Sequence, residues 1–145
     1  GGYNLYKYAP DPTGWIDPLG LCSKALSSNM TQGGTPRPAN SAAHHIVGDT
    51  AKLAAPARAV LAKHNIHVDN AVNGVFLPNR NNFDSNVPGI LHNGKHPNSY
   101  FESVNQLIIS ADKAGGKPMI LKTLDRIRNT LLSSPRDAQW SGLFG

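Results

Sequence analysis

Apolar residues recur at helical spacing in the second half of the chain, where they predict two long helices. The first begins with a capping box of Ser99 and Glu102, ends at Gly115 and has an apolar stripe of Tyr100, Val104, Leu107 and Ile108. The second covers residues 117–134, and its inward face consists of Met119, Leu124, Ile127 and Leu131. We expect the basic side chains of this helix to face solvent: Lys122, Arg126 and Arg128.

The pattern before residue 99 predicts shorter elements. A helix is expected after Thr50, which can cap it, from the spacing of Leu53, Ala57, Val60 and Leu61. Pro56 predicts a break within that helix. The segment AVNGVFLP (residues 71–78) is typical of a short strand, entered through Asn-Gly and ended by proline. Residues 79–98 are rich in Asn, Asp, Gly and Pro and predict a long loop, which in a compact domain is usually functional or disordered.

The chain divides into three parts by composition. Residues 1–21, GGYNLYKYAPDPTGWIDPLGL, hold three of the four tyrosines and several turn signals, and we interpret them as the end of a β-rich upstream body. Residues 22–40 are rich in Ser, Thr, Gly and Pro and predict a linker. The compact domain is therefore expected over residues 41–145, with Trp140 and Phe144 either packed on it or free to meet a partner.

Charge and composition narrow the class of protein. The 145 residues suit one domain, and a single cysteine, Cys22, excludes an internal disulfide and a cysteine-rich zinc site. No apolar stretch is long enough to span a membrane, and no secretory signal is recognisable, although a chain that opens on Gly-Gly is expected to be a piece of a longer one. The net charge of +5 favours a polyanionic partner or simply gives a soluble basic surface.

The six histidines fall in three pairs. His44 and His45 are neighbours, so on an extended strand their rings point to opposite faces. Such a pair suits two roles, in which one ring ligates a metal and the other, with an ordinary pKa of about 6.5, acts as a base. His64 and His67 are interpreted as surface or turn residues at a corner between elements.

The third pair, His92 and His96, precedes the first long helix. Pro97 disfavours helical backbone at His96, so both are placed on a loop, where a turn can bring two imidazoles to one divalent ion. Asn73 stands beside Gly74 at the start of the predicted strand, either as a plain Asn-Gly turn or with its amide bonded to a carbonyl or a ring nitrogen. The order His-His, Asn on a strand, His before a helix is more specific than any one of these residues.

Three blocks, AAHHIV, AVNGVFLP and LHNGKHPNSYFESVNQL, resemble the AHH family of nucleases within the HNH (His-Me finger) superfamily, in the order in which that family has them. The resemblance covers about residues 41–110. It implies an α+β fold, a ββα-metal core with additional helices that is mostly helical overall. It also implies an endonuclease that uses one divalent metal ion, such as Mg, Mn, Ni or Zn.

The same resemblance implies roles for individual residues. His44 matches the metal ligand and His45 the general base, an order that can be reversed, while Asn73 matches the residue that holds the loop carrying the base. His92 and His96 match further metal ligands, although the long segment between His45 and Asn73 and the proline after His96 depart from a minimal ββα unit and put one of these two in doubt. Tyr100 either lines the site or belongs to the core. Two loop cations are candidates for gripping phosphates or are plain solvated charges: Arg80 and Lys95.

Residues 1–21 resemble the end of an Rhs-repeat core, in which Asp-Pro-x-Gly-Leu marks the boundary to a C-terminal toxin. This implies autoproteolysis after Leu21 with Asp17 as the motif aspartate, a reaction that we do not expect here because a second upstream aspartate is missing. It further implies an effector secreted by a type VI system into the cytoplasm of a target bacterium, attached to an Rhs shell in its parent protein and neutralised by a cognate immunity protein.

Several functions remain open from the sequence. DNA is the substrate that the resemblance favours, with little sequence specificity, and RNA is an alternative for the same fold. The histidines could instead hold a structural metal in a noncatalytic nucleic-acid-binding module, or the domain could sequester a partner protein. A cysteine nucleophile at Cys22 is disfavoured because no base is near it in the sequence.

Overall fold

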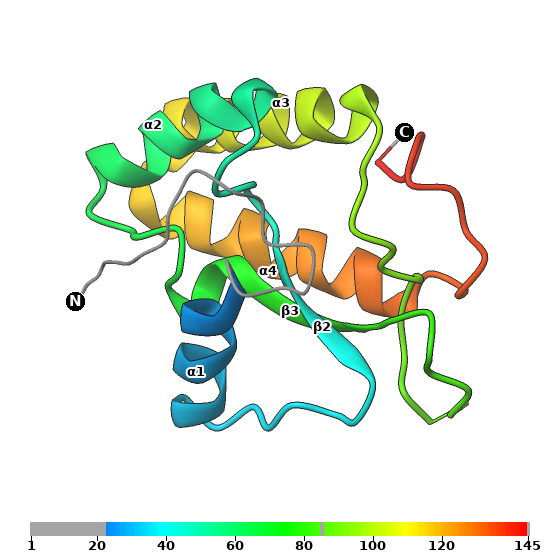
Figure 1. Ribbon diagram of the computed structural model, residues 1–145. Coiled ribbons are helices and arrows are strands. Elements are labelled where there is room, and N and C mark those ends of the chain that lie inside the picture. The colour runs from blue at the N-terminus through cyan, green and yellow to red at the C-terminus, as the bar shows by residue number, and fades with distance from the viewer. Residues whose placement is uncertain (1–22, 85, 145) are drawn as a thin grey trace.

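The computed structural model describes residues 23–84 and 86–144 (Figure 1). In this part of the chain a two-stranded antiparallel sheet is surrounded by four α-helices, which confirms the predicted α+β class. The elements occur in this order: α1 (Lys24–Gln32), β2 (Ser41–His45), the 3-10 helix η2 (Lys52–Ala54), α2 (Ala55–Lys63), the 3-10 helix η3 (Ala71–Asn73), β3 (Gly74–Pro78), α3 (Asn98–Gly115) and α4 (Lys117–Ser133).

The two strands place the histidine pair at a defined register. His44 lies opposite Val75 and His45 opposite Gly74. The connection between the strands carries α2, which packs beside α3, while α4 crosses beneath them (Figure 1). The loop after β3 then leads into α3, so that strand, strand and helix follow one another around the histidines as a ββα unit.

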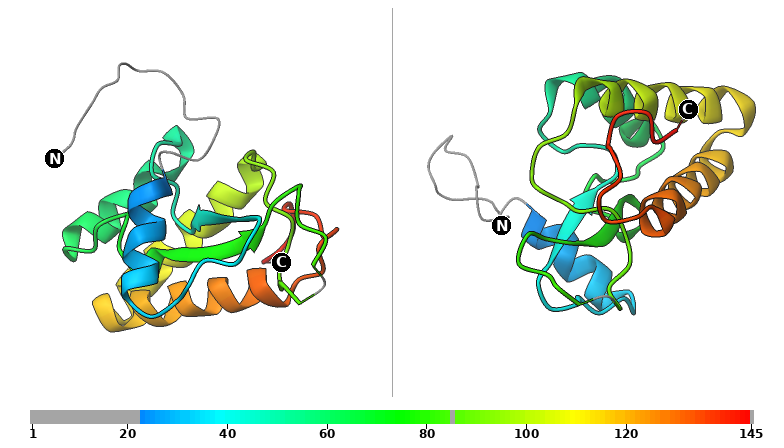
Figure 2. Two further views of the ribbon diagram at one scale, coloured as in Figure 1. Left: turned by 60° about the horizontal axis from the view of Figure 1, so that its bottom comes forward. Right: turned by 90° about the vertical axis from the view of Figure 1, so that its right-hand side faces the viewer.

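The prediction of a linker over residues 22–40 is wrong for Lys24–Gln32, which forms α1. Leu26 and Met30 lie four residues apart and are both buried, so they face the sheet. Gly74 permits this contact, because a Cβ there would come within 2.5 Å of the Met30 sulfur and 2.7 Å of a Leu26 methyl carbon. The helix α1 therefore belongs to the folded domain (Figure 2).

Three local predictions differ from the structure near the helix starts. Pro56 does not break a helix but lies in the first turn of α2, where its missing N–H is not needed. Thr50 does not cap it, since the preceding 3-10 helix begins after Ala51 without a side-chain cap. The capping box of Ser99 and Glu102 is also absent, because α3 is entered from Pro97 without a side-chain cap.

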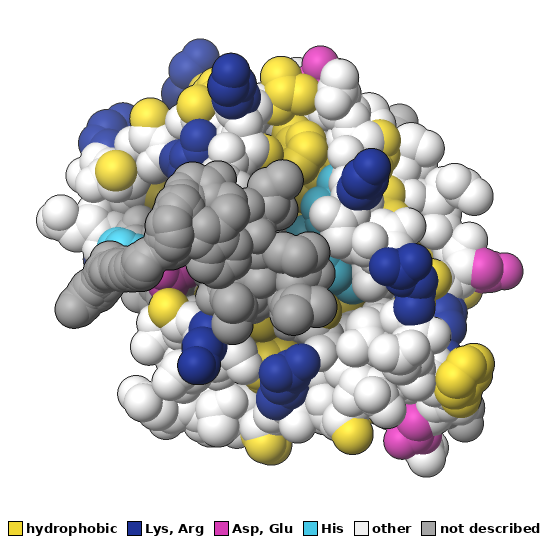
Figure 3. Space-filling view, viewed as in Figure 1, with side chains coloured by type: hydrophobic (Ala, Val, Ile, Leu, Met, Phe, Trp, Pro, Cys, Tyr) yellow, Lys and Arg dark blue, Asp and Glu magenta, His cyan; other side chains and the backbone are white. Residues whose placement is uncertain are grey.

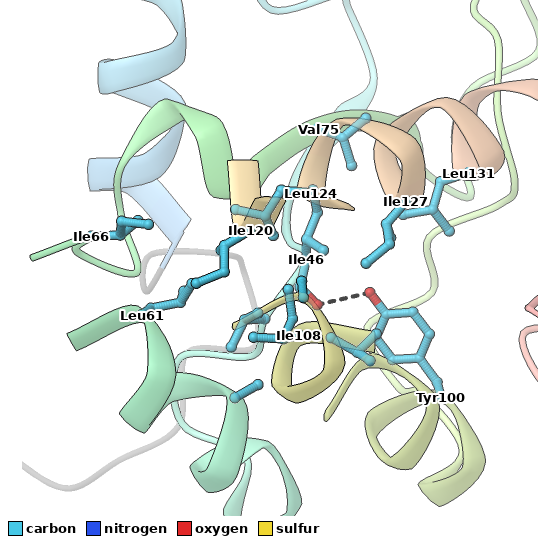
Figure 4. Packing of buried hydrophobic residues seen from close by; sticks show 14 of the residues in the cluster. Ile46, Leu61, Ile66, Val75, Tyr100, Ile108, Ile120, Leu124, Ile127 and Leu131 are labelled. Carbon is cyan, nitrogen blue, oxygen red and sulfur yellow. Dashed lines mark hydrogen bonds between the residues drawn. The ribbon is translucent and has the colours of Figure 1, made fainter. Parts of the chain in front are cut away.

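The core lies between α3, α4, α2 and the sheet (Figure 4). Its fully buried side chains include Ile46, Leu61, Ile108, Leu124 and Leu131. The predicted inward stripes of the two long helices are buried or partly buried, as expected.

One of the predicted solvent-facing cations of α4 turns inward instead. The guanidinium of Arg128 donates to the carbonyl of Val72 at 2.5 Å and to that of Gly74 at 3.0 Å. A long side chain can cover its apolar stem while its head reaches backbone oxygens. Arg128 therefore ties α4 to the start of β3, whereas Lys122 and Arg126 are exposed as predicted.

Candidate metal centre and catalytic site

Three histidines from two separate parts of the chain meet in the structure. His44 belongs to β2, whereas His92 and His96 lie on the loop before α3. Each offers a ring nitrogen, and these three nitrogens lie within 4.8 Å of one another. The ring centroids are 5.2 Å apart for His44 and His92, 4.9 Å for His44 and His96, and 5.1 Å for His92 and His96. We call these three residues the histidine cluster.

Backbone hydrogen bonds hold the loop that carries two members of the cluster. The N–H of His92 donates to the carbonyl of Pro78, the last residue of β3, at 2.9 Å. The N–H of Ile90, whose side chain is fully buried, donates to the carbonyl of Leu131 on α4 at 3.1 Å. Pro97 has extended backbone and starts α3, so His96 stays on the loop as predicted.

The surroundings of the cluster keep its imidazoles neutral. Burial, reinforced by the neighbouring imidazoles, holds the pKa of His44 well below its usual range. Burial likewise lowers the pKa of His92 and of His96, each to about 4. Neutral imidazole is the form that ligates a metal ion.

One buried ring nitrogen of the cluster is suited to bond a metal ion. Nδ1 of His96 is buried without a hydrogen-bond partner among the described residues. A buried polar atom without a partner is costly, and a metal–nitrogen bond would remove that cost. The donor set of three neutral imidazoles suits Zn, Ni or another divalent transition metal better than a hard, oxygen-preferring cation.

Tyr100 determines which nitrogen of His44 is free. Its hydroxyl donates to the carbonyl of Ile46 at 2.9 Å, the bond drawn as a dashed line in Figure 4. The same hydroxyl lies 2.8 Å from Nε2 of His44 and, having used its single proton, must accept there. Burial raises the pKa of the Tyr100 phenol, so the proton stays on its oxygen. Nε2 of His44 therefore carries the hydrogen, and Nδ1 is the nitrogen available to a metal ion.

The C-terminal segment packs on the histidine cluster rather than extending away. The ring centroid of Trp140 lies 4.3 Å from that of His96 and 5.1 Å from that of His44. Its indole N–H donates to the carbonyl of Leu91 at 2.9 Å, which fixes the ring against the loop. Of the two placements considered for Trp140, the structure shows the packed one, and Phe144 also lies against Tyr100.

His45 points away from the cluster, as the alternation of a strand requires. Its Nε2 lies 2.7 Å from Oδ1 of Asp69, and its Nδ1 lies 3.8 Å from Oδ1 of Asp49. Neither aspartate was identified from the sequence. Asp49 follows His45 by four residues, but Asp69 is 24 residues away and reaches the ring only through the fold of the intervening loop.

Asn73 holds the backbone beside this second site. Its side chain is fully buried; the amide oxygen accepts from the N–H of Val47 at 2.9 Å, and the amide nitrogen donates to the carbonyls of Val47 and Val68 at 3.1 and 2.8 Å. The residues after His45 and those before Asp69 are thus bound to one amide. The sequence left two alternatives for Asn73, a plain Asn-Gly turn or a bonded amide. The structure shows the amide bonded to backbone carbonyls, and Gly74 has extended backbone with a φ of −125°.

The two loop cations proposed to grip phosphates are exposed but lie in different places. Lys95 stands between the two loop histidines and lines a cavity of about 390 Å³, together with Arg136 and Trp140 of the C-terminal segment. Arg80 follows β3 and does not line this cavity. Figure 3 shows histidine side chains in a surface hollow beside several Lys and Arg side chains.

The remaining predicted residues lie away from the cluster. His64 ends α2 and bonds Asp112 through Nε2 at 2.7 Å, and His67 is exposed in a turn, which agrees with their interpretation as surface or turn residues. Asp17 and Leu21, and the expectations attached to residues 1–21, lie outside the described residues. No helix in the described part of the chain is long and apolar enough to cross a membrane.

Two antiparallel strands and the helix that follows them thus bring three histidines together, next to a fourth histidine that bonds an aspartate. Comparison with family models identifies the family itself. The chain belongs to the AHH family, a nuclease family of the HNH/ENDO VII superfamily with conserved AHH, and the match covers residues 25–131. Ala43, His44 and His45 supply that triplet. No curated protein and no solved structure matches the chain.

Proposed function

We propose that this domain is a metal-dependent endonuclease that cleaves DNA with little sequence specificity. The proposal rests on the different surroundings of the two neighbouring histidines of the AHH triplet. His44 belongs to the histidine cluster, whereas the ring of His45 bonds Asp69. A nuclease acts on nucleic acid, and the net charge of +5 favours such a polyanion.

Residues of this chain can supply the metal ligands, the general base and the phosphate contacts that cleavage of a phosphodiester requires. His44 through Nδ1, together with His92 and His96, would hold one divalent cation. Such an ion, when bound, supplies positive charge to the scissile phosphate and to the leaving oxygen. His45 removes a proton from the attacking water, and Asn73 keeps the strand end and the Val68 carbonyl in fixed relation to that base. Lys95 and Arg80 contact neighbouring phosphates.

Three ligands favour catalysis over a purely structural metal. A structural site usually closes its coordination with four protein ligands, whereas a catalytic site keeps positions open for water and substrate. Among the residues that the structure describes, the candidate group contains three. This supports the nuclease over a noncatalytic, metal-stabilised nucleic-acid-binding module. RNA is the second substrate to test, because nothing in the histidine cluster itself distinguishes ribose from deoxyribose.

The biological setting of the proposal rests on the Rhs-like residues 1–21. In this setting the domain is the toxin of a secreted effector, carried by a type VI system into the cytoplasm of a competing bacterium and kept inactive in the producer by an immunity protein. Release of the toxin after Leu21 would use Asp17, the aspartate of the Asp-Pro-x-Gly-Leu motif. A basic nuclease surface would favour an acidic immunity protein.

The experiment that tests the proposed activity is cleavage of plasmid DNA and of a structured RNA, each with Mg, Mn, Ni or Zn and with a chelator. We expect the plasmid to be nicked and linearised with metal and to stay intact with chelator. His45→Ala is expected to abolish cleavage, whereas His64→Ala, which also removes an aspartate-bonded imidazole, should retain it. DNA that stays intact with every metal would contradict the proposal.

A further inference from the structure

We propose that Asp69 is a positioning residue for His45, fixing the ring so that Nδ1 is the atom that accepts the proton. The inference rests on the proposed function, in which His45 is the base, and adds the group that orients it. Asp69 does not touch the reacting atoms in this proposal and acts only through the imidazole.

The contact between the two side chains determines the tautomer. Nε2 of His45 lies 2.7 Å from Oδ1 of Asp69, and both side chains are largely withdrawn from solvent, with exposed fractions of 7% and 23%. A carboxylate oxygen only accepts, so Nε2 must carry the hydrogen. In the neutral ring this leaves Nδ1 without a hydrogen, as a base requires.

The structure holds Asp69 in place from several directions. Its N–H donates to Nδ1 of His67 at 3.0 Å, and its carbonyl accepts from the side-chain amide of Asn29 on α1 at 2.7 Å. The carbonyl of Val68, one residue earlier, accepts from Asn73 at 2.8 Å. These three bonds, two of them to other elements, restrain the backbone next to the carboxylate, and the bond to Asn29 links α1 to it.

The other ring nitrogen of His45, Nδ1, lies near a second carboxylate, that of Asp49. Nδ1 is 3.8 Å from Oδ1 of Asp49, beyond hydrogen-bond distance, so that carboxylate does not hold a hydrogen on Nδ1. The segment around Asp49 is itself restrained, because Arg58 donates to the carbonyls of Gly48 and Ala51 at 2.8 and 2.6 Å.

The proton transfer balances without moving a proton to Asp69. An O–H bond of the attacking water breaks and its proton bonds to Nδ1, while the water oxygen forms the new bond to phosphorus and the bond from phosphorus to the leaving oxygen breaks. The ring is then an imidazolium, whose Nε2–H still donates to Asp69. The proton on Nδ1 returns to solvent or to the leaving oxygen before the next turnover.

A matched pair of variants tests the inference. Asp69→Asn keeps the shape of the side chain but permits the amide to donate to Nε2, and Asp112→Asn makes the same change where Asp112 bonds His64 at the same distance of 2.7 Å. We expect Asp69→Asn to lower kcat about 100-fold with KM and metal affinity unchanged, the lower end of what general-base catalysis contributes. Asp112→Asn should leave kcat unchanged. Asp69→Glu, which restores a carboxylate, should recover part of the lost rate.

A spectroscopic measurement keeps the inference testable whether or not a variant folds. In the wild-type protein labelled with ¹⁵N-histidine, we expect the His45 ring to show the Nε2–H tautomer, and in Asp69→Asn a shift toward Nδ1–H. A wild-type ring with its hydrogen on Nδ1 would overturn the inference, as would Asp69→Asn with unchanged kcat and tautomer. Failure of the wild-type protein to cleave nucleic acid would instead overturn the proposed function, so the two failures are distinguishable.

Discussion

Nε2 of His44 donates to the hydroxyl of Tyr100 across 2.8 Å, and that hydroxyl in turn donates to the carbonyl of Ile46, two residues further along the same chain segment. One side chain at the start of α3 thereby fixes both the ring of a β2 histidine and the backbone that follows it. Ligand histidines commonly pass their second ring N–H to such a partner, which orients the ring and raises its affinity for metal.

Replacement of Tyr100 by Phe should weaken metal binding about 10-fold, because Nε2–H of His44 loses its acceptor and the ring is no longer held in one tautomer. Titration of Zn or Mn into the metal-free protein measures this effect. Thr123→Val is the matched control, since it removes a buried hydroxyl that bonds Met119 on α4. Equal metal affinity in the two variants would show that Tyr100 has only a packing role.

Replacement of Trp140 by Ala should lower the free energy of unfolding by about 3 kcal/mol, because the indole packs against the histidine cluster and its N–H bonds Leu91. Chemical denaturation measures the change. Phe83→Ala is the control, because that side chain is 90% exposed and its loss should change stability by less than about 0.5 kcal/mol. A similar, small effect for both variants would mean that the C-terminal segment does not stabilise the domain.

The metal-free protein should lose stability as the pH falls from 6.5 toward 4. The pKa of His92 and of His96 is about 4 in the folded protein, against an ordinary value of 6.5, so the unfolded chain binds more protons in this interval. The contribution is therefore complete above pH 6.5 and decreases as the pH approaches 4. Urea unfolding at several pH values, in chelator, measures the slope. A double variant of these histidines to Gln should flatten it, and an unchanged slope would contradict the assignment.

Replacement of Lys95 by Gln should raise KM for DNA and reduce the salt dependence of binding by about one ion, with kcat nearly unchanged, if this exposed cation contacts a phosphate. The same holds for Arg80→Gln. Lys122→Gln on the exposed face of α4 removes an equal charge away from the site and should have a smaller effect. Equal effects of all three changes would indicate that only the overall charge matters.

The sequence predicted the fold class and the meeting of three histidines, but not the residues around His45. The cluster of His44, His92 and His96 could be predicted because a histidine pair, a strand and a histidine-bearing loop occur in a recognisable order. The role of Asp69 could not be predicted, because its contact with His45 depends on how the chain between them, 24 residues apart, folds back. No local pattern contains that information.

The errors about the fold have physical causes of the same kind. The helix α1 has only two strongly apolar positions that become buried, Leu26 and Met30, in a polar segment whose composition suggested a linker. Its partner surface at Gly74 is created by tertiary packing. From the sequence alone Pro56 predicts a helix break, because its place in the first turn of α2 is known only once the start of that helix is known.

Metal binding compared with cleavage in two neighbouring variants tests the central claim most directly. His44→Ala and His45→Ala alter adjacent residues of one strand whose side chains face opposite ways. Calorimetric titration with metal should show that His45→Ala binds one ion with wild-type affinity yet does not cleave plasmid DNA. His44→Ala should bind metal far more weakly and also fail to cleave. Loss of metal binding in His45→Ala, or full cleavage by it, would contradict the division of roles.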